Sequence, residues 1–131
     1  GANLDRIQVV KGWLDAAGKT HERVFDVSWS DADKRPRSAN GKVPSVGSSV
    51  NEREATYTND IGATTLTSHW SDPSFDPAQK AFYYVRVMEI PTPTWLAYDR
   101  KNFNLYDEMP AKAPYTSQER AYTSPIWYNP S

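Results

Sequence analysis

The side chains that could do chemistry are few in this sequence, and none falls in a catalytic or metal-binding motif. The two histidines, His21 and His69, have no Asp, Glu or His two or four residues away, as zinc-binding motifs often do. There is no GxSxG, P-loop or GxGxxG motif, and the absence of cysteine excludes disulfides and thiolate metal sites. The sequence therefore predicts no catalytic residue, no cofactor and no metal site within this chain.

Paired carboxylates are a weaker signal and leave two interpretations open. Glycosidases need two acids that converge in space, and the turn from Asp72 to Asp76 could hold calcium through its oxygen atoms. The glycine and repeated-oxygen pattern of an EF-type loop is missing, and acid spacing in loops has almost no specificity. The acid pairs are Asp31/Asp33, Glu52/Glu54 and Asp72/Asp76.

Aromatic residues are concentrated in the last third of the chain. They could form a carbohydrate-stacking platform through Trp95, Tyr98 and Trp127, or they could cover sheet edges or pack against a neighbouring domain, which is the more frequent arrangement. The residues that we select for contact with another domain or a ligand are Trp95, Tyr98, Tyr115, Arg120 and Trp127.

A basic cluster, Lys34, Arg35 and Arg37, lies in the long loop that residues 31–51 form by composition. It could bind an anion, but a solvated loop is the simpler interpretation and the one that we favour.

Composition limits the class of protein. The chain has 131 residues, which fits one domain, and a net charge of −1 from scattered charges, which gives no field to attract nucleic acid. Its longest apolar run is roughly ten residues, too short for the ~20 of a membrane span. Aromatic residues make up 13% of a chain with 10 prolines, so we expect an aromatic core bordered by proline-marked loops.

Alternation of apolar and polar residues predicts an antiparallel β-sandwich of the immunoglobulin or fibronectin type, with about six strands. The central strand is Ala81 to Ile90, which Pro91 and Pro93 should end. In the strand from His21 to Ser30, we expect the core-facing side chains to be Phe25, Val27 and Trp29. The other expected strands are 4–14, 54–59, 64–70 and a last one within 118–128, which Pro125 confines to an edge or a bulge.

Two further expectations concern local structure. No segment of about ten residues has a helical period, and the chain from Pro93 to Pro110 is expected to be irregular. Tyr83 or Tyr84 is placed for the tyrosine corner of immunoglobulin-like domains, although a plain core tyrosine fits equally well.

Four segments give the chain a resemblance to a known family. They are LDRIQVVKGW, VFDVSWSD, ATYTNDIGATTLTSHWSDPSFDPAQKAFYYVRVMEIPTPTWLAYD and QERAYTSPIWYNP. Together they closely resemble the C-terminal portion of the bacterial domain of unknown function 3604 family. The chain departs from the family pattern at two places: it has Ser48-Ser49 where the family frequently has Asn-Thr, and Thr94 where the family commonly has arginine. An arginine that contacts an anion at position 94 is therefore not expected in this chain.

The resemblance implies a longer, often exported parent whose preceding part looks like a metal-dependent hydrolase of the polymerase and histidinol phosphatase superfamily. The divalent metal and its histidines would lie in that preceding part, and the compartment would be periplasmic or extracellular. We therefore expect residues 1–131 to be a single β-sandwich domain, a fragment that acts as a non-catalytic C-terminal accessory domain. The alternative is an autonomous glycan-binding module. Because such parents commonly have a strand before Gly1, we also expect an open sheet edge through which copies self-associate.

Overall fold

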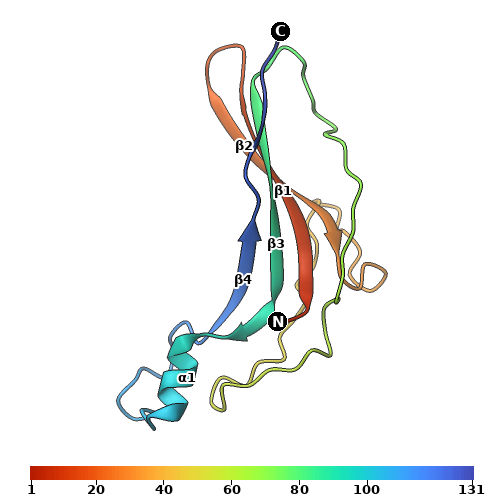
Figure 1. Cartoon of the computed structure of the whole chain (residues 1–131). Helices are drawn as coiled ribbons and strands as arrows, with labels where there is room; N and C mark the ends of the chain where they lie inside the picture. The colour runs from red at the N-terminus through yellow and green to blue at the C-terminus, as the bar shows by residue number, and fades with distance from the viewer.

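The computed structural model describes all residues, 1–131, as one open antiparallel sheet of five strands with a short helix beyond one end (Figure 1). Its elements are β1 (Leu4–Leu14), β2 (Thr20–Trp29), β3 (Ala81–Pro93), α1 (Trp95–Asn102), β4 (Thr116–Tyr122) and β5 (Ile126–Tyr128). The strand order is β2-β1-β3-β4, and β5 also pairs with β3. The predicted all-β antiparallel fold is confirmed, with five strands rather than about six.

The two faces of the sheet differ in what covers them. Successive side chains of a strand point to opposite faces, so Val9 and Val85, which are paired across β1 and β3, lie on one face. Val10 and Tyr84, the next pair, lie on the other. We call the first the covered face, because the segment 61–80, here named the strap, lies against it. The other is the open face, on which Val24, Tyr122 and Trp127 remain exposed.

The strap is fastened near its start by backbone hydrogen bonds between Leu4 and Ala63, of 2.7 and 2.9 Å. In Figure 1 it runs alongside the sheet as an extended segment. The strand predicted at 64–70 is wrong, because this segment has no backbone partner, although Leu66 and Trp70 do face the sheet. The strand predicted at 54–59 is also wrong: residues 52–55 form a turn closed by an isolated bridge between Asn51 and Thr56.

β3 continues past the point where its prolines were expected to end it. Pro91, Thr92 and Pro93 pair with β4 after a register shift that begins at Met88. The N–H of Thr94 donates to the carbonyl of Tyr115 (2.9 Å), so alternation turns Thr92 towards β4 and both proline nitrogens away from it. Because β1 pairs with β3 only as far as Glu89, the missing proline donors leave no ladder bond unmade.

α1 contradicts the expectation that the chain is irregular past Pro93. The helix has only eight residues and buries only Ala97 and Arg100, so it carries almost no apolar stripe for a sequence pattern to detect. It packs on a small second core with Ala55 and Tyr115, apart from the main sheet. This helix is too short and too polar to cross a membrane.

The last predicted strand is divided in two. β4 ends at Tyr122 and β5 begins at Ile126, directly after Pro125. Both lie on the edge of the sheet, as the proline predicted.

The basic cluster in the loop is not uniformly solvated, which corrects the interpretation that we favoured. Arg35 is buried and makes five hydrogen bonds, to Asp5, to both oxygens of Ser30 and twice to the carbonyl of Pro44. Asp5 lies where the β1–β3 register shifts, and such a bulge re-aims a side chain. Arg37 donates to the carbonyls of Gly41 and Asp26, so both guanidinium groups fasten the loop to the sheet.

Candidate functional site

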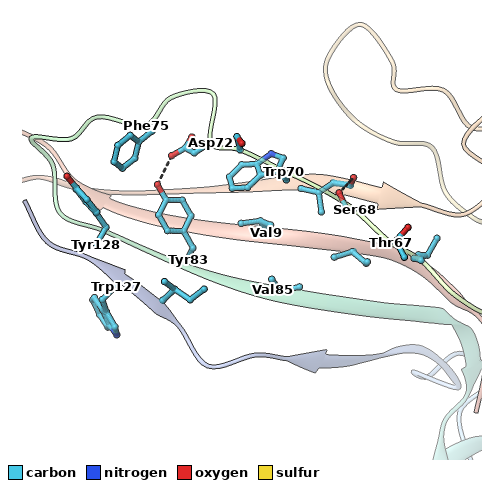
Figure 2. A pocket seen from close by; sticks show the side chains of 15 residues that line it. Val9, Thr67, Ser68, Trp70, Asp72, Phe75, Tyr83, Val85, Trp127 and Tyr128 are labelled. Atoms are coloured by element: carbon cyan, nitrogen blue, oxygen red, sulfur yellow. Dashed lines mark hydrogen bonds between the residues drawn. The ribbon is translucent and has the colours of Figure 1, made fainter.

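A cavity of about 970 Å³ lies between the covered face and the strap (Figure 2). Its floor is apolar, because residues two apart on β1 and β3 point to the same face. The strap forms the opposite wall, and β5 closes one end. The lining residues discussed below are Val9, Trp70, Asp72, Phe75, Tyr83, Val85 and Tyr128, while Trp127 of the edge strand β5 borders both this cavity and the hollow on the open face.

Aromatic contacts hold the strap against the sheet. Trp70 lies 5.0 Å from Phe25 of β2 and 6.2 Å from Tyr83 of β3, measured between ring centroids. Phe75 meets Tyr128 of β5 edge-on at 4.9 Å. Figure 2 shows Trp70 and Phe75 on the strap and Tyr83 and Tyr128 on the strands that face it. The strap therefore reaches β2, β3 and β5 through side chains, without a backbone ladder.

A buried ion pair lies at one end of the cavity. Lys11 of β1 places its Nζ 2.6 Å from Oδ2 of Asp72, and the same oxygen accepts a hydrogen bond from the Tyr83 hydroxyl at 2.6 Å. Lys11 also donates to the carbonyl and hydroxyl of Ser74, and Ser74 donates to Oδ1 of Asp72. This group of four residues, which we name the clamp, joins the strap to the sheet.

The clamp leaves its acidic groups unreactive at neutral pH. Burial alone would raise the pKa of Asp72, but hydrogen bonds from Lys11, Tyr83 and Ser74 outweigh it and lower the pKa from 3.8 to about 2. Burial, followed by the bond to the Asp72 carboxylate, raises the pKa of Tyr83 well above its ordinary value. Asp72 is therefore a fully bonded anion and Tyr83 a neutral donor. The cavity can accommodate a largely apolar group, because its charge is compensated from within.

A second surface, on the open face, consists of four aromatic side chains. The centroids of Phe82 and Tyr84 lie 6.5 Å apart with planes within 5°, while Trp127 lies 5.3 Å from Phe82 and Tyr122 lies 6.2 Å from Tyr84. A Cβ added to Gly12 would meet two ring carbons of Phe82 at 2.3 Å. Phe82 therefore lies directly against the backbone of β1, and a side chain at position 12 would displace its ring. We call these four residues the aromatic row.

The five residues selected from the sequence are divided among separate places. Trp95 and Tyr98 lie on α1 with 70% and 41% of their surface exposed, whereas Trp127, 67% exposed, lies on β5 opposite Phe82. β3 separates these two places by roughly 35 Å, at about 3.3 Å per residue. Tyr115 is fully buried beneath Arg100, whose guanidinium lies 3.8 Å from its ring, and Arg120 is exposed on β4. The structure therefore does not bring Trp95, Tyr98 and Trp127 together.

Three acids of the predicted pairs accept hydrogen bonds within the protein. Asp72 belongs to the clamp, Asp76 accepts a hydrogen bond from the N–H of Ala78, and Glu52 accepts one from Thr116. No group of three or more His, Asp and Glu side chains is arranged to hold a metal ion. His21 lies 2.7 Å from Asp15. The hydrogen bond to His21 and then the N–H of Lys19 lower the pKa of Asp15.

Sequence reasoning did not select the clamp or most of the aromatic row. Tyr83 does tie back upstream, but to the carboxylate of Asp72 rather than to the backbone as a tyrosine corner would. The row had a detectable signal, since Phe82 and Tyr84 are two residues apart in a strand and so share a face. The sequence signal for the clamp was weaker: it was a single lysine, Lys11, among the apolar residues of β1.

Comparison with known proteins adds a family but no characterised relative. No curated protein and no solved structure matches the chain. The family model described as protein of unknown function (DUF3604) matches residues 1–130, and the chain belongs to this family.

Proposed function

We propose that this chain is a non-catalytic C-terminal accessory domain of a metal-dependent, phosphoesterase-like hydrolase, and that its α1 end packs against the hydrolase domain of the same polypeptide. In this proposal the divalent metal is bound outside residues 1–131, and the protein is periplasmic or secreted. The proposal rests on the resemblance described above and on one structural observation, the exposed aromatic surface at the α1 end.

That surface consists of Trp95, Tyr98 and Phe103, which are 70%, 41% and 69% exposed. Large aromatic side chains gathered in the open are typical of protein interfaces, where they supply much of the binding energy. On an isolated domain they would remain in contact with water. Packing against a neighbouring domain removes them from it.

The α1 end is also built rigidly enough to serve as a preformed interface. Arg100 stacks on the buried ring of Tyr115 and donates to the carbonyl of Glu52 at 3.1 Å. Pro91 and Pro93 restrict the backbone that leads into the helix. A preorganised surface loses little conformational entropy on docking.

Hydrogen exchange tests this docking directly. We expect amides of 95–103 to exchange at least tenfold more slowly in the full-length parent than in the 131-residue chain. A parent carrying Trp95→Ala and Phe103→Ala should regain fast exchange in this segment. The matched control is a parent carrying Ile126→Ala, which alters an exposed residue of β5 opposite Tyr83. This variant should keep slow exchange in 95–103. Equal exchange in parent and isolated chain would contradict docking through α1.

The non-catalytic role has its own test. With added Mn²⁺ or Zn²⁺, the parent should hydrolyse bis(4-nitrophenyl) phosphate, and the purified 131-residue chain should not. Metal-stimulated turnover by the chain alone would refute the role that we assign to it.

We also propose that copies of the isolated chain self-associate through the exposed edge formed by β4. The N–H of Thr123 donates to the carbonyl of Val85, so alternation turns the N–H groups of Arg120 and Tyr122 away from β3. Such an unpaired edge is a template for strand pairing. Arg120→Pro removes one outward donor without removing a bond to β3. In sedimentation experiments the wild-type chain should associate as its concentration rises, and Arg120→Pro should weaken this association. A wild-type chain that stays monomeric at all concentrations would exclude self-association through β4.

A further inference from the structure

We propose that the open face is a carbohydrate-binding surface, on which the aromatic row stacks against the sugar rings of an oligosaccharide and a small adjoining hollow takes one ring. This inference rests on Phe82, Tyr84, Tyr122 and Trp127 and does not depend on the proposed docking of α1. The two surfaces lie at different places on the molecule, so each can fail without the other.

The orientation of the rings suits stacking. Phe82 lies over Gly12, and Tyr84 is parallel to it within 5°. The Phe82 ring therefore lies against the backbone of β1, and the Tyr84 ring has the same orientation. Trp127 is inclined by 47° to Phe82, and Tyr122 by 53° to Tyr84. The apolar C–H face of a pyranose matches an aromatic ring in size and contacts it in the same way as another ring does.

A hollow of about 260 Å³ opens beside Phe82 and Trp127. Gly12 and four polar residues, Thr20, His21, Lys80 and Asn129, line it. His21 is hydrogen-bonded to Asp15, whereas the side chains of Thr20, Lys80 and Asn129 have no hydrogen-bond partner within the protein. A site with aromatic walls and a few convergent polar groups is the usual design for a small polar ligand.

Free hydrogen-bonding groups distinguish a sugar from an apolar protein partner. The hydroxyls of Tyr84 and Tyr122 and the indole N–H of Trp127 have no partner within the chain. An apolar surface pressed against them would leave three polar groups unsatisfied, each at a substantial desolvation penalty. A sugar covers the rings with its C–H face and offers its hydroxyls to those groups. The chemistry of the surface therefore favours a carbohydrate.

Calorimetry and tryptophan fluorescence on the 131-residue chain test the proposal. The probes are neutral hexasaccharides of β-linked glucose, xylose, mannose and N-acetylglucosamine, together with hexagalacturonate as the anionic arm. We expect saturable binding to at least one of them. Truncation of a stacked ring should weaken it about tenfold, as for bases stacked on aromatic side chains.

The variants are chosen so that folding does not obscure the result. Trp127→Ala and Tyr122→Ala remove rings that are 67% and 58% exposed, and Lys80→Ala removes a polar group of the hollow. All three should weaken binding while leaving the thermal midpoint nearly unchanged. Trp95→Ala, which removes an equally exposed tryptophan from α1, is the matched control and should bind as wild type does.

Three outcomes would overturn the proposal. The first is a folded wild type that binds none of the five probes. The second is binding that survives Trp127→Ala or is lost in Trp95→Ala. The third is a dimer, or a parent protein, in which Tyr84 and Trp127 are shielded by other protein.

Discussion

Nζ of Lys11 lies 2.6 Å from Oδ2 of Asp72, and both side chains are almost fully buried. Lys11 belongs to β1 and Asp72 to the strap, and no other ion pair joins the strap to the sheet. Because the strap has no backbone ladder along 64–71, this pair, the aromatic contacts and the hydrogen bond from the Ser68 hydroxyl to the carbonyl of Val27 hold it over the covered face. The cavity lies beneath the strap that these contacts hold.

Removing either member of this pair should destabilise the fold. Lys11→Met leaves the Asp72 carboxylate buried without its cation, which typically costs about 3 kcal/mol. Asp72→Asn leaves Lys11 unpaired and should cost a similar amount. Lys19→Met, which alters an exposed lysine in the turn after β1, is the control and should change little. Urea unfolding measures all three, and a Lys11→Met variant as stable as wild type would contradict the role of the clamp.

The same clamp predicts how stability depends on acid. The pKa of Asp72 is lowered from 3.8 to about 2, so its contribution is fully present above pH 3.8. As pH falls from 3.8 towards 2, the unfolded state takes up a proton before the folded state does, and about 2 kcal/mol of stability is lost. Unfolding free energies of wild type and Asp72→Asn should therefore converge over this range. A constant difference between pH 5 and pH 2 would mean that the carboxylate is not held in this way.

Much of the sheet could be predicted because side-chain alternation reports directly on strands that bury one face. β1, β2 and the first part of β3 follow that pattern. The segment 64–70 has the same alternation, since Leu66 and Trp70 face the sheet, yet it is no strand. Alternation reveals which side chains turn inward, whereas strand pairing depends on a backbone partner that the local sequence does not encode.

The candidate sites were less accessible to sequence reasoning. Trp127 could be selected by type and position, but its neighbours Phe82 and Tyr84 could be assigned to the open face only once the other face was seen to carry the strap. The clamp joins residues far apart in the chain, and Asp72 looked like an ordinary turn residue before a proline. Likewise Arg100 stabilises α1 by stacking on Tyr115 from a later segment, which no helical period signals.

Gly62 should be the glycine least tolerant of substitution. Its φ is +81°, and a Cβ there would lie 2.6 Å from Cγ2 of the buried Ile90 and 3.0 Å from the carbonyl oxygen of Leu4. Gly62→Ala should therefore cost more than about 2 kcal/mol, as strain and overpacking add. Gly47, with φ +83° and nothing within 4 Å of its Cβ position, is the matched control. Gly47→Ala should cost only about 1 kcal/mol by thermal or urea unfolding, from backbone strain alone. Equal costs would show that the strap start is not packed as described.

Enlarging adjacent residues of β1 should distinguish the two faces of the sheet. Val9 lines the cavity, whereas Val10 is only 1% exposed on the other face. Val9→Phe extends into open space and should change stability by less than about 1 kcal/mol, while Val10→Phe overpacks its site and should cost about 1–3 kcal/mol. Chemical denaturation of both variants gives the comparison. If Val9→Phe were the more damaging, the space beneath the strap would be filled.

Arg35 and Lys34 are adjacent basic residues that should behave in opposite ways. Arg35 is buried, and Nη2 lies 2.7 Å from Oδ1 of Asp5, while Lys34 is exposed. Arg35→Lys keeps the charge but cannot reproduce the planar set of five hydrogen bonds, so it should cost about 2–3 kcal/mol. Lys34→Met should leave the unfolding free energy within about 0.5 kcal/mol of wild type. If the cluster instead served to bind anions, sulfate would stabilise the wild type and Lys34→Met would remove that effect. A fold that resists Arg35→Lys would show that the loop 31–44 is not fastened through Asp5.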